Sequence, residues 1–287
     1  MSTMTGLRTF QDAVVLITGG ASGIGRAFAR NLAGRGASVI LGDLQEEEVE
    51  RAAWEIRTGG GKAQATPLDV ADWRAVRRFV DAAMEEHGRI DYLFNNAGIG
   101  VGGEAAHYEL EDWFRVLAVN LNGVVHGVQA AYPHMRRQRF GHIVNTASMA
   151  GLLPAPNVIS YTTSKHAVVG LSNALRIEAE SAGVRVSVLC PGVVRTPIIE
   201  GGKYGRTVGP VPQEAMGKLF ERLRPMDVDR FAELALRDVA NNKAIIIHPA
   251  RWRWIWRMYR LWPGFGFASG RRSLAMVRSL AESVQSR

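Results

Sequence analysis

The chain has 287 residues, of which 47% are apolar and 22% charged, which fits a soluble globular protein and excludes a disordered, collagen-like or coiled-coil chain. Its single cysteine, Cys190, excludes an internal disulfide and a metal site built on several cysteines. Residues 248–287 hold eight arginines against one glutamate and so contribute +7 of the net charge of +8. The first 247 residues are therefore nearly neutral, and the high pI belongs to a basic tail.

No N-terminal segment combines a basic start with a long apolar stretch, so we expect no secretory signal. The two longest uncharged stretches, 116–135 and 141–164, contain Asn, Gln or Ser together with Pro and do not predict a membrane span. The sequence therefore predicts a cytoplasmic protein.

Short apolar runs alternate with longer helical patterns along the chain. Strands are predicted at 13–18, 38–42, 62–68, 91–94, 142–145, 184–189 and 244–247. Helices are predicted from the first glycine-rich turn to about 35, from the end of the second strand to about 57, and at 71–87, 109–137 and 160–182. This alternation predicts an α/β fold with a single doubly wound, Rossmann-type parallel sheet flanked by helices. We expect one dinucleotide-binding and catalytic domain over 1–250 and a basic, aromatic extension over 251–287.

A glycine-rich turn, Thr18-Gly19-Gly20-Ala21-Ser22-Gly23-Ile24-Gly25, follows the first strand and opens a helix. Glycines let backbone N–H groups and the helix N-terminus approach a pyrophosphate. The spacing Gly-x-x-x-Gly-x-Gly matches the usual dinucleotide fingerprint only loosely, and a flexible βα loop is the alternative.

Asp43 closes the second predicted strand, 18 residues after Gly25. A carboxylate at this place accepts hydrogen bonds from both ribose hydroxyls of NAD and repels a 2′-phosphate. No Arg or Lys stands at Ala21, Ser22 or Leu44 to receive that phosphate, so NAD is favoured over NADP. The alternative is an ordinary strand-end Asp that caps the next helix.

Tyr161 and Lys165 lie four residues apart in a predicted helix and share one face. A tyrosine has an ordinary pKa of about 10 and is a poor acid–base group at neutral pH. A nearby ammonium favours the phenolate and makes proton exchange with an alcohol or carbonyl practicable. The pair alone is also compatible with a surface Tyr stacked on a Lys stem.

Together with Asn95-Asn96-Ala97-Gly98, Asn120, Ser148 and Pro191-Gly192, these motifs resemble the short-chain dehydrogenase/reductase family in its compact single-domain branch. Order and spacing match over about residues 10–250, including Ser148 thirteen residues before Tyr161.

The resemblance implies a role for each residue. Tyr161 would be the general acid/base, and Lys165 would bind the nicotinamide ribose and lower the pKa of Tyr161. Ser148 would hydrogen-bond the substrate oxygen, and Asn120 would hold a water that links Lys165 to solvent. The implied cofactor-binding residues are Gly19, Ser22, Gly23, Ile24, Gly25, Asp43, Leu44, Asp69, Val70, Asn96, Ala97, Gly98, Tyr161, Lys165, Pro191, Gly192, Val194 and Thr196. No metal is expected.

The uncharged segment 149–159 borders the substrate in this family, and the Gly- and Pro-rich segment 196–225 is expected to form a mobile lid. These features predict an NAD-dependent alcohol dehydrogenase or ketoreductase for a hydrophobic secondary alcohol and its ketone. The resemblance also implies a homo-oligomer, a dimer or a tetramer, formed through the long helices.

The segment 251–262 (RWRWIWRMYRLW) departs from the family pattern. On a helical wheel Arg253, Arg257 and Arg260 cluster opposite Trp252, Ile255, Trp256, Tyr259 and Trp262. Such a helix could pack against a partner subunit or over the substrate pocket. It could also bind an anionic membrane surface, while binding to nucleic acid is the least favoured alternative. Residues 251–256 also alternate as a strand would.

Two rival functions stay open. The first is a membrane-peripheral NAD-binding or scaffold protein without turnover, against which the Ser148–Tyr161–Lys165–Asn120 set argues, because a pure binder needs no proton relay. The second is a sugar-nucleotide epimerase, which needs a larger substrate domain than the residues after Lys165 provide.

Overall fold

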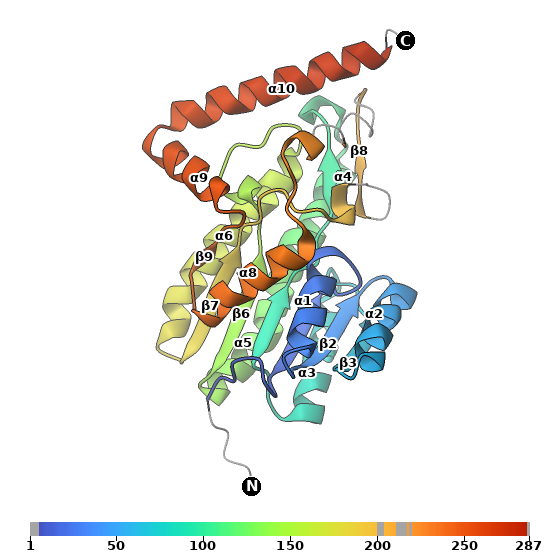
Figure 1. The fold of residues 1–287 in the computed structure, drawn as a ribbon, viewed down its shortest axis with the longest axis vertical. Helices are drawn as coiled ribbons and strands as arrows, with labels where there is room; N and C mark the ends of the chain where they lie inside the picture. Colours follow the sequence, from blue (N-terminus) through green and yellow to red (C-terminus); the bar gives the residue numbers. More distant parts are fainter. Residues whose placement is uncertain (1–5, 200–203, 211–216, 218–219, 286–287) are drawn as a thin grey trace.

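A seven-stranded parallel sheet forms the centre of the computed structural model, which describes residues 6–199, 204–210, 217 and 220–285 (Figure 1). The strand order is β3-β2-β1-β4-β6-β7-β9. The strands are β1 Val14–Thr18, β2 Ser38–Asp43, β3 Lys62–Pro67, β4 Tyr92–Asn95, β6 Gly141–Thr146, β7 Val184–Leu189 and β9 Ile245–Ile246. The chain winds outward from β1 in one direction and then from β4 in the other, so the predicted doubly wound Rossmann-type fold is confirmed.

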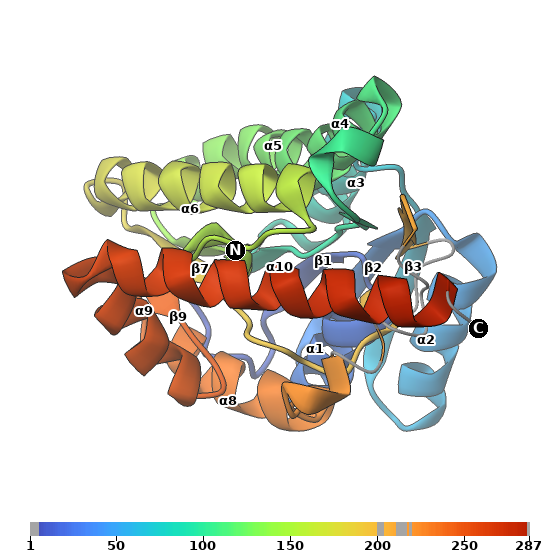
Figure 2. The same cartoon turned by 90° about the horizontal axis from the view of Figure 1, so that it is seen from above.

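Helices cover both faces of the sheet (Figure 2). Helices α1 (Gly23–Ala33), α2 (Glu46–Thr58) and α8 (Val228–Ala240) pack on one face, and α3 (Trp73–His87), α5 (Gly123–Gln138) and α6 (Ile159–Glu180) pack on the other. Helix α4 (Leu110–Leu117) precedes α5, and α9 (Arg251–Leu261) and α10 (Pro263–Gln285) end the chain. A small second sheet pairs β5 (Gly100–Gly102) with β8 (Gly205–Thr207).

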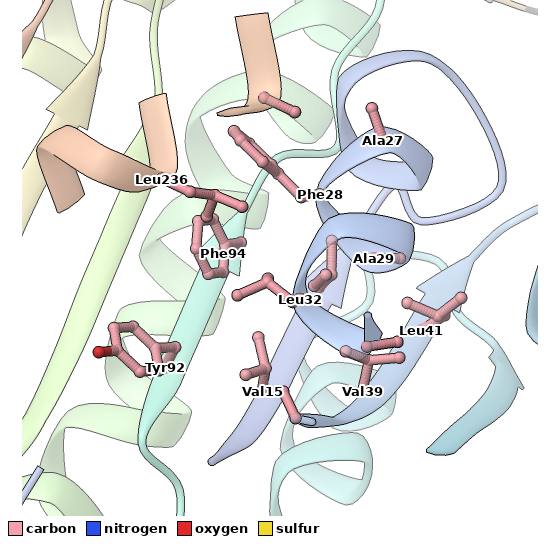
Figure 3. Close-up of a cluster of buried hydrophobic side chains, with 14 of the residues drawn as sticks. Val15, Ala27, Phe28, Ala29, Leu32, Val39, Leu41, Tyr92, Phe94 and Leu236 are labelled. Carbon is pink, nitrogen blue, oxygen red and sulfur yellow. The ribbon is translucent and has the colours of Figure 1, made fainter. Parts of the chain in front are cut away.

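The apolar strands are buried on both sides because neighbouring residues face opposite layers. Along β1, Val15 and Ile17 join the cluster under α1 and α8, while Val14 and Leu16 join the cluster under α3 and α5. Figure 3 shows the first cluster, in which Phe28 of α1 and Leu236 of α8 lie near Phe94 of β4. This packing explains why the central strands read as continuous apolar runs.

The helix predicted over 109–137 is interrupted. A π-helical turn, Ala118–Asn122, separates α4 from α5. Within it the Asn120 side chain turns inward and bonds the backbone of Ile99, accepting from N (2.8 Å) and donating to O (2.9 Å). Such single-turn bulges are frequent at functional sites.

Three helices at the end of the chain were not all foreseen. Helices α8 and α10 were not predicted from the sequence. The pattern of α9 was compatible with a helix or a strand, and the structure shows a helix. Of the expected lid, 196–225, the structure describes a short 3-10 turn, Pro197–Ile199, and β8, while 200–203, 211–216 and 218–219 lie outside the described residues.

A buried ion pair ties the N-terminal segment to the sheet. Asp91 is fully buried and accepts hydrogen bonds from Arg89 Nε (2.8 Å), the backbone N of Arg8 (3.1 Å) and the backbone N of Val14 (3.0 Å). Removal of one partner leaves the other charge buried and uncompensated.

We therefore expect Asp91→Ala to lower the free energy of unfolding by about 3–5 kcal/mol. The matched control is Glu233→Ala, whose carboxylate pairs with Arg230 at the surface, and it should cost no more than about 1 kcal/mol. Urea unfolding followed by circular dichroism measures both. Equal losses in the two variants would contradict this account.

Candidate active site

The glycine turn lies against the loop that leaves β4. A Cβ on Gly19 would stand 2.8 Å from Ala97 Cα, and a Cβ on Gly25 would stand 2.1 Å from Gly19 O, so neither position admits a side chain. Thr18 Oγ1 accepts hydrogen bonds from the backbone N of Asn96 (3.0 Å) and of Ala97 (3.2 Å). The bare backbone at the N-terminus of α1 is the kind of cradle that fits a pyrophosphate.

Asp43 is buried at the end of β2, beside this turn. Its carboxylate accepts from the backbone N of Ala21 (3.0 Å) and of Gln45 (3.1 Å). Gln45 is the residue before α2, so Asp43 also supports the start of that helix, as the alternative reading expected. A carboxylate fixed between the turn and α2 fits a dinucleotide with an unphosphorylated ribose.

Three further residues expected to bind the cofactor follow the ends of neighbouring strands. Leu44 follows β2 and is 71% exposed. Asp69 follows β3, and its Oδ1 accepts from Ala71 N (2.9 Å). Val70 is buried, and its carbonyl lies 2.8 Å from His126 Nδ1.

Four predicted catalytic residues lie together past the carboxyl ends of β4 and β6. Lys165 Nζ donates to Thr146 O (2.8 Å) and lies 5.4 Å from the centre of the Tyr161 ring. The Ser148 side chain lies near the Tyr161 phenol and lowers its pKa. A Cβ on Gly98 would stand 3.3 Å from Asn120 Oδ1 and 3.5 Å from Lys165 Nζ, so both polar groups lie beside this glycine.

Burial controls the acid–base properties of this group. It raises the pKa of the Tyr161 phenol above its ordinary value, with Cys190 adding to the rise and the nearby Ser148 side chain opposing it. It also lowers the pKa of Lys165 to about 8 and raises that of Cys190 to about 12. We expected Lys165 to draw the pKa of Tyr161 down; in this structure desolvation outweighs any such effect.

The segment after β7 closes the site. Pro191 O accepts from Met149 N (2.9 Å), which ties this segment to the residue after Ser148. Gly192 N donates to His248 O (2.9 Å), and Val194 pairs with Met226 in an isolated bridge.

Thr196 reaches back to the glycine turn. The side chain of Thr196 lies 3.3 Å from the place of a Cβ on Gly23. Ser22 and Ile24 stand in the same turn, so the loops after β1 and β7 meet.

Two neighbours of the site were missed from the sequence. The acceptor for Lys165 is the main-chain carbonyl of Thr146, which no side-chain pattern can reveal. The Trp252 indole packs on Gly192, 2.3 Å from the place a Cβ would take. The helical wheel that groups Trp252 with Trp256 was the available signal.

Within the part of the chain that the structure describes, no group of three or more His, Cys, Asp or Glu side chains is arranged to hold a metal ion. In the same part, no helix has the length and apolar character needed to cross a membrane.

Comparison with known proteins adds to this geometry. A family model described as short chain dehydrogenase matches residues 13–203, about two thirds of the chain. The chain is 37% identical over 214 residues to meso-2,3-butanediol dehydrogenase of Serratia marcescens, covering 75% of this chain and 80% of that protein. It is 43% identical over 191 residues to the probable oxidoreductase EphD of Mycobacterium tuberculosis, covering 66% of this chain but 32% of that protein. The chain thus spans about a third of the length of EphD.

Solved structures agree with the fold. A short chain dehydrogenase/reductase from Burkholderia phymatum in complex with NAD superposes with a TM-score of 0.80 at 32% identity, covering 88% of this chain and 95% of that one. Levodione reductase superposes with a TM-score of 0.75 at 32% identity, covering 83% and 96%. The glycine turn, the Tyr161 group and these matches agree: the chain belongs to the short-chain dehydrogenase/reductase family of oxidoreductases.

Proposed function

We propose that this protein is an NAD-dependent oxidoreductase that interconverts a hydrophobic secondary alcohol and its ketone. The observation that carries the proposal is the group of Ser148, Tyr161, Lys165 and Asn120, in which Lys165 and Asn120 are buried and Ser148 and Tyr161 partly buried. A nicotinamide cofactor, when bound, supplies the hydride chemistry. The protein then has to orient the substrate oxygen and exchange one proton with it.

Tyr161 is the acid–base group in this proposal. The Ser148 side chain lies near its phenol and lowers the pKa of that group, so we assign to both residues a contact with one substrate oxygen. Cys190 is no rival nucleophile, because burial raises the pKa of its thiol to about 12 and keeps it neutral.

Lys165 and Asn120 continue the proposed proton path from Tyr161 toward solvent. A lysine with a pKa of about 8 can both hold and release a proton near neutral pH. Asn120 Nδ2 donates to Ser164 Oγ (3.2 Å), the residue next to Lys165. We assign to Asn120 the role of holding a water molecule that connects Lys165 to solvent.

Gly19, Gly23 and Gly25 would hold the pyrophosphate of NAD, and Asp43 the adenosine ribose. NADP would bring a phosphate to the buried carboxylate of Asp43 with no Arg or Lys at Ala21, Ser22 or Leu44 to balance it. The remaining cofactor contacts are proposed for Asp69, Val70, Asn96, Ala97, Gly98, Pro191, Gly192, Val194 and Thr196.

Relatives suggest which alcohol to try. The chain is 38% identical over 191 residues to the cyclohexanol dehydrogenase of an Acinetobacter strain and 37% identical over 227 residues to the 2,5-dichloro-2,5-cyclohexadiene-1,4-diol dehydrogenase LinX of Sphingobium indicum. Both names describe ring alcohols. With the uncharged segment 149–159, they favour alicyclic secondary alcohols as substrates.

We further propose that residues 1–250 form the catalytic domain, with 251–287 as an extension, and that the protein is a cytoplasmic homo-oligomer. The rival function is an NAD-binding scaffold without turnover. Such a scaffold would not need the buried Lys165 beside Tyr161 and Ser148.

Tyr161→Phe removes the proton-transfer hydroxyl and keeps the ring. We expect it to lower turnover at least 100-fold, the lower range of what a general acid–base contributes, and to leave NAD binding intact. NADH formation from a panel of alicyclic alcohols, followed by ultraviolet absorbance, measures turnover, and calorimetry measures NAD binding. Unchanged turnover in the variant would exclude this role. An inactive wild type that still binds NAD would favour the scaffold.

Asp43→Asn keeps one carbonyl acceptor at this position and removes the charge. We expect NAD affinity to fall about tenfold, equivalent to about 1.4 kcal/mol, while NADP affinity falls less or rises. Calorimetric titration of both cofactors decides this. If both affinities fell equally, Asp43 would be a structural support of α2 only.

The buried ammonium of Lys165 predicts a pH dependence of stability. Its folded pKa of about 8 lies below the ordinary value of 10.5, so the unfolded chain holds more protons between these pH values and stability rises there with pH. Relative to Lys165→Met, the wild type should gain on the order of 3 kcal/mol between about pH 7 and pH 10.5. Urea unfolding of both proteins across this range tests it, and parallel curves would refute it.

A further inference from the structure

Five apolar side chains are exposed where α9 ends and α10 begins, at residues 258–267, which we call the corner (Figure 1). Their exposed fractions are 37% for Met258, 71% for Leu261, 62% for Trp262, 47% for Phe265 and 51% for Phe267. Exposed large apolar side chains gathered in one short segment point to an interaction site.

The corner differs from the aromatic face that the sequence suggested. Trp252 and Trp256 are partly buried against the core cluster under α3, α5 and α6. Tyr259 packs on Gly266 and meets Phe267 edge to face. Trp252 and Trp256 thus attach α9 to the body of the protein and Tyr259 attaches it to α10, so these three rings are not part of the corner.

The surroundings of the corner are basic. Arg257 and Arg260 flank it on α9 and Arg271 and Arg272 on α10, all four exposed. No acidic residue occurs between positions 249 and 281. The guanidinium groups of Arg257 and Arg260 lie over the rings of Trp254 and Trp256, at 5.3 and 5.4 Å. The aliphatic parts of the two arginine side chains thus lie along the tryptophan rings, while the guanidinium charges stay at the surface.

We propose that the corner docks on the surface of an anionic lipid membrane. Exposed Trp, Phe and Leu side chains with an arginine rim match the interface of a bilayer with negative headgroups. A second copy of the chain fits less well, because a two-fold contact through the corner would bring like-charged arginine rims together. Nucleic acid would meet the arginines but leave Leu261, Trp262 and Phe265 without an apolar partner.

Docking would also bring the site near the lipid. From the corner, α10 crosses above the carboxyl ends of the strands (Figure 2). It passes Pro156, 3.7 Å from the place of a Cβ on Gly270, and its Arg278 bonds Glu104 (Nε to Oε1, 2.8 Å). The carboxyl ends of the strands would then lie on the side of the molecule that faces the membrane. The docking itself holds whether or not the protein is a dehydrogenase.

Flotation of the full chain with phosphatidylcholine vesicles, with and without phosphatidylglycerol, tests the proposal. We expect binding to the anionic vesicles that weakens with added salt. Trp262→Glu combined with Phe265→Glu should lower the bound fraction at least tenfold. Arg257→Gln combined with Arg260→Gln should weaken binding about 30-fold, from about 1 kcal/mol for each arginine.

Leu110→Glu combined with Phe114→Glu is the matched control, because these side chains of α4 are 67% and 62% exposed but lie outside the corner. It should bind vesicles as the wild type does. Equal loss in this control, no binding by the wild type, or equal binding to neutral vesicles would overturn the proposal. So would a dimer, seen by light scattering, that only the corner variants abolish.

Discussion

The hydroxyl of Thr18 joins two loops, and the geometry of the site depends on this contact. By accepting hydrogen bonds from the backbone N of Asn96 and of Ala97, it holds the loop after β4 against the turn after β1. The approach is so close that no Cβ fits at Gly19. Because β1 and β4 flank the point where the strand order reverses, this contact forms the base of the crevice in which such sheets bind dinucleotides.

The same crevice contains a group that works against stability. A buried ammonium is expensive to keep charged, and the pKa of Lys165, lowered to about 8, expresses that cost. Its hydrogen bond to Thr146 O compensates only in part. Residues of this kind cluster at functional sites because their chemistry requires them there. In the proposed mechanism the lysine, and not the tyrosine with its raised pKa, is the group whose pKa most favours proton transfer.

The sequence predicts the sheet well and the irregular elements poorly. Continuous Val, Ile and Leu runs identify strands that are buried on both faces, so β1 and β7 agree within a residue. The π-helical turn at Asn120 could not be predicted, because its cause is a contact with Ile99 across the fold. α8 carried an overlooked signal, since Asp227 accepts from Arg230 N as an N-cap. α10 was hidden by its glycines, although Pro263 is favourable at a first helical position.

For the tail, the helical wheel identified the correct aromatic side but not what covers it. Periodicity shows that Trp252 and Trp256 share a face, and only tertiary structure shows that the protein itself buries that face. The exposed corner arises because α9 ends at Leu261 and α10 begins at Pro263. The apolar residues before and after Trp262 therefore do not lie on one face of a single helix. A wheel drawn over 251–262 cannot represent a surface shared by two helices. The membrane hypothesis therefore moves from the aromatic face of α9 to the apolar corner, where the charges and the exposed rings coincide.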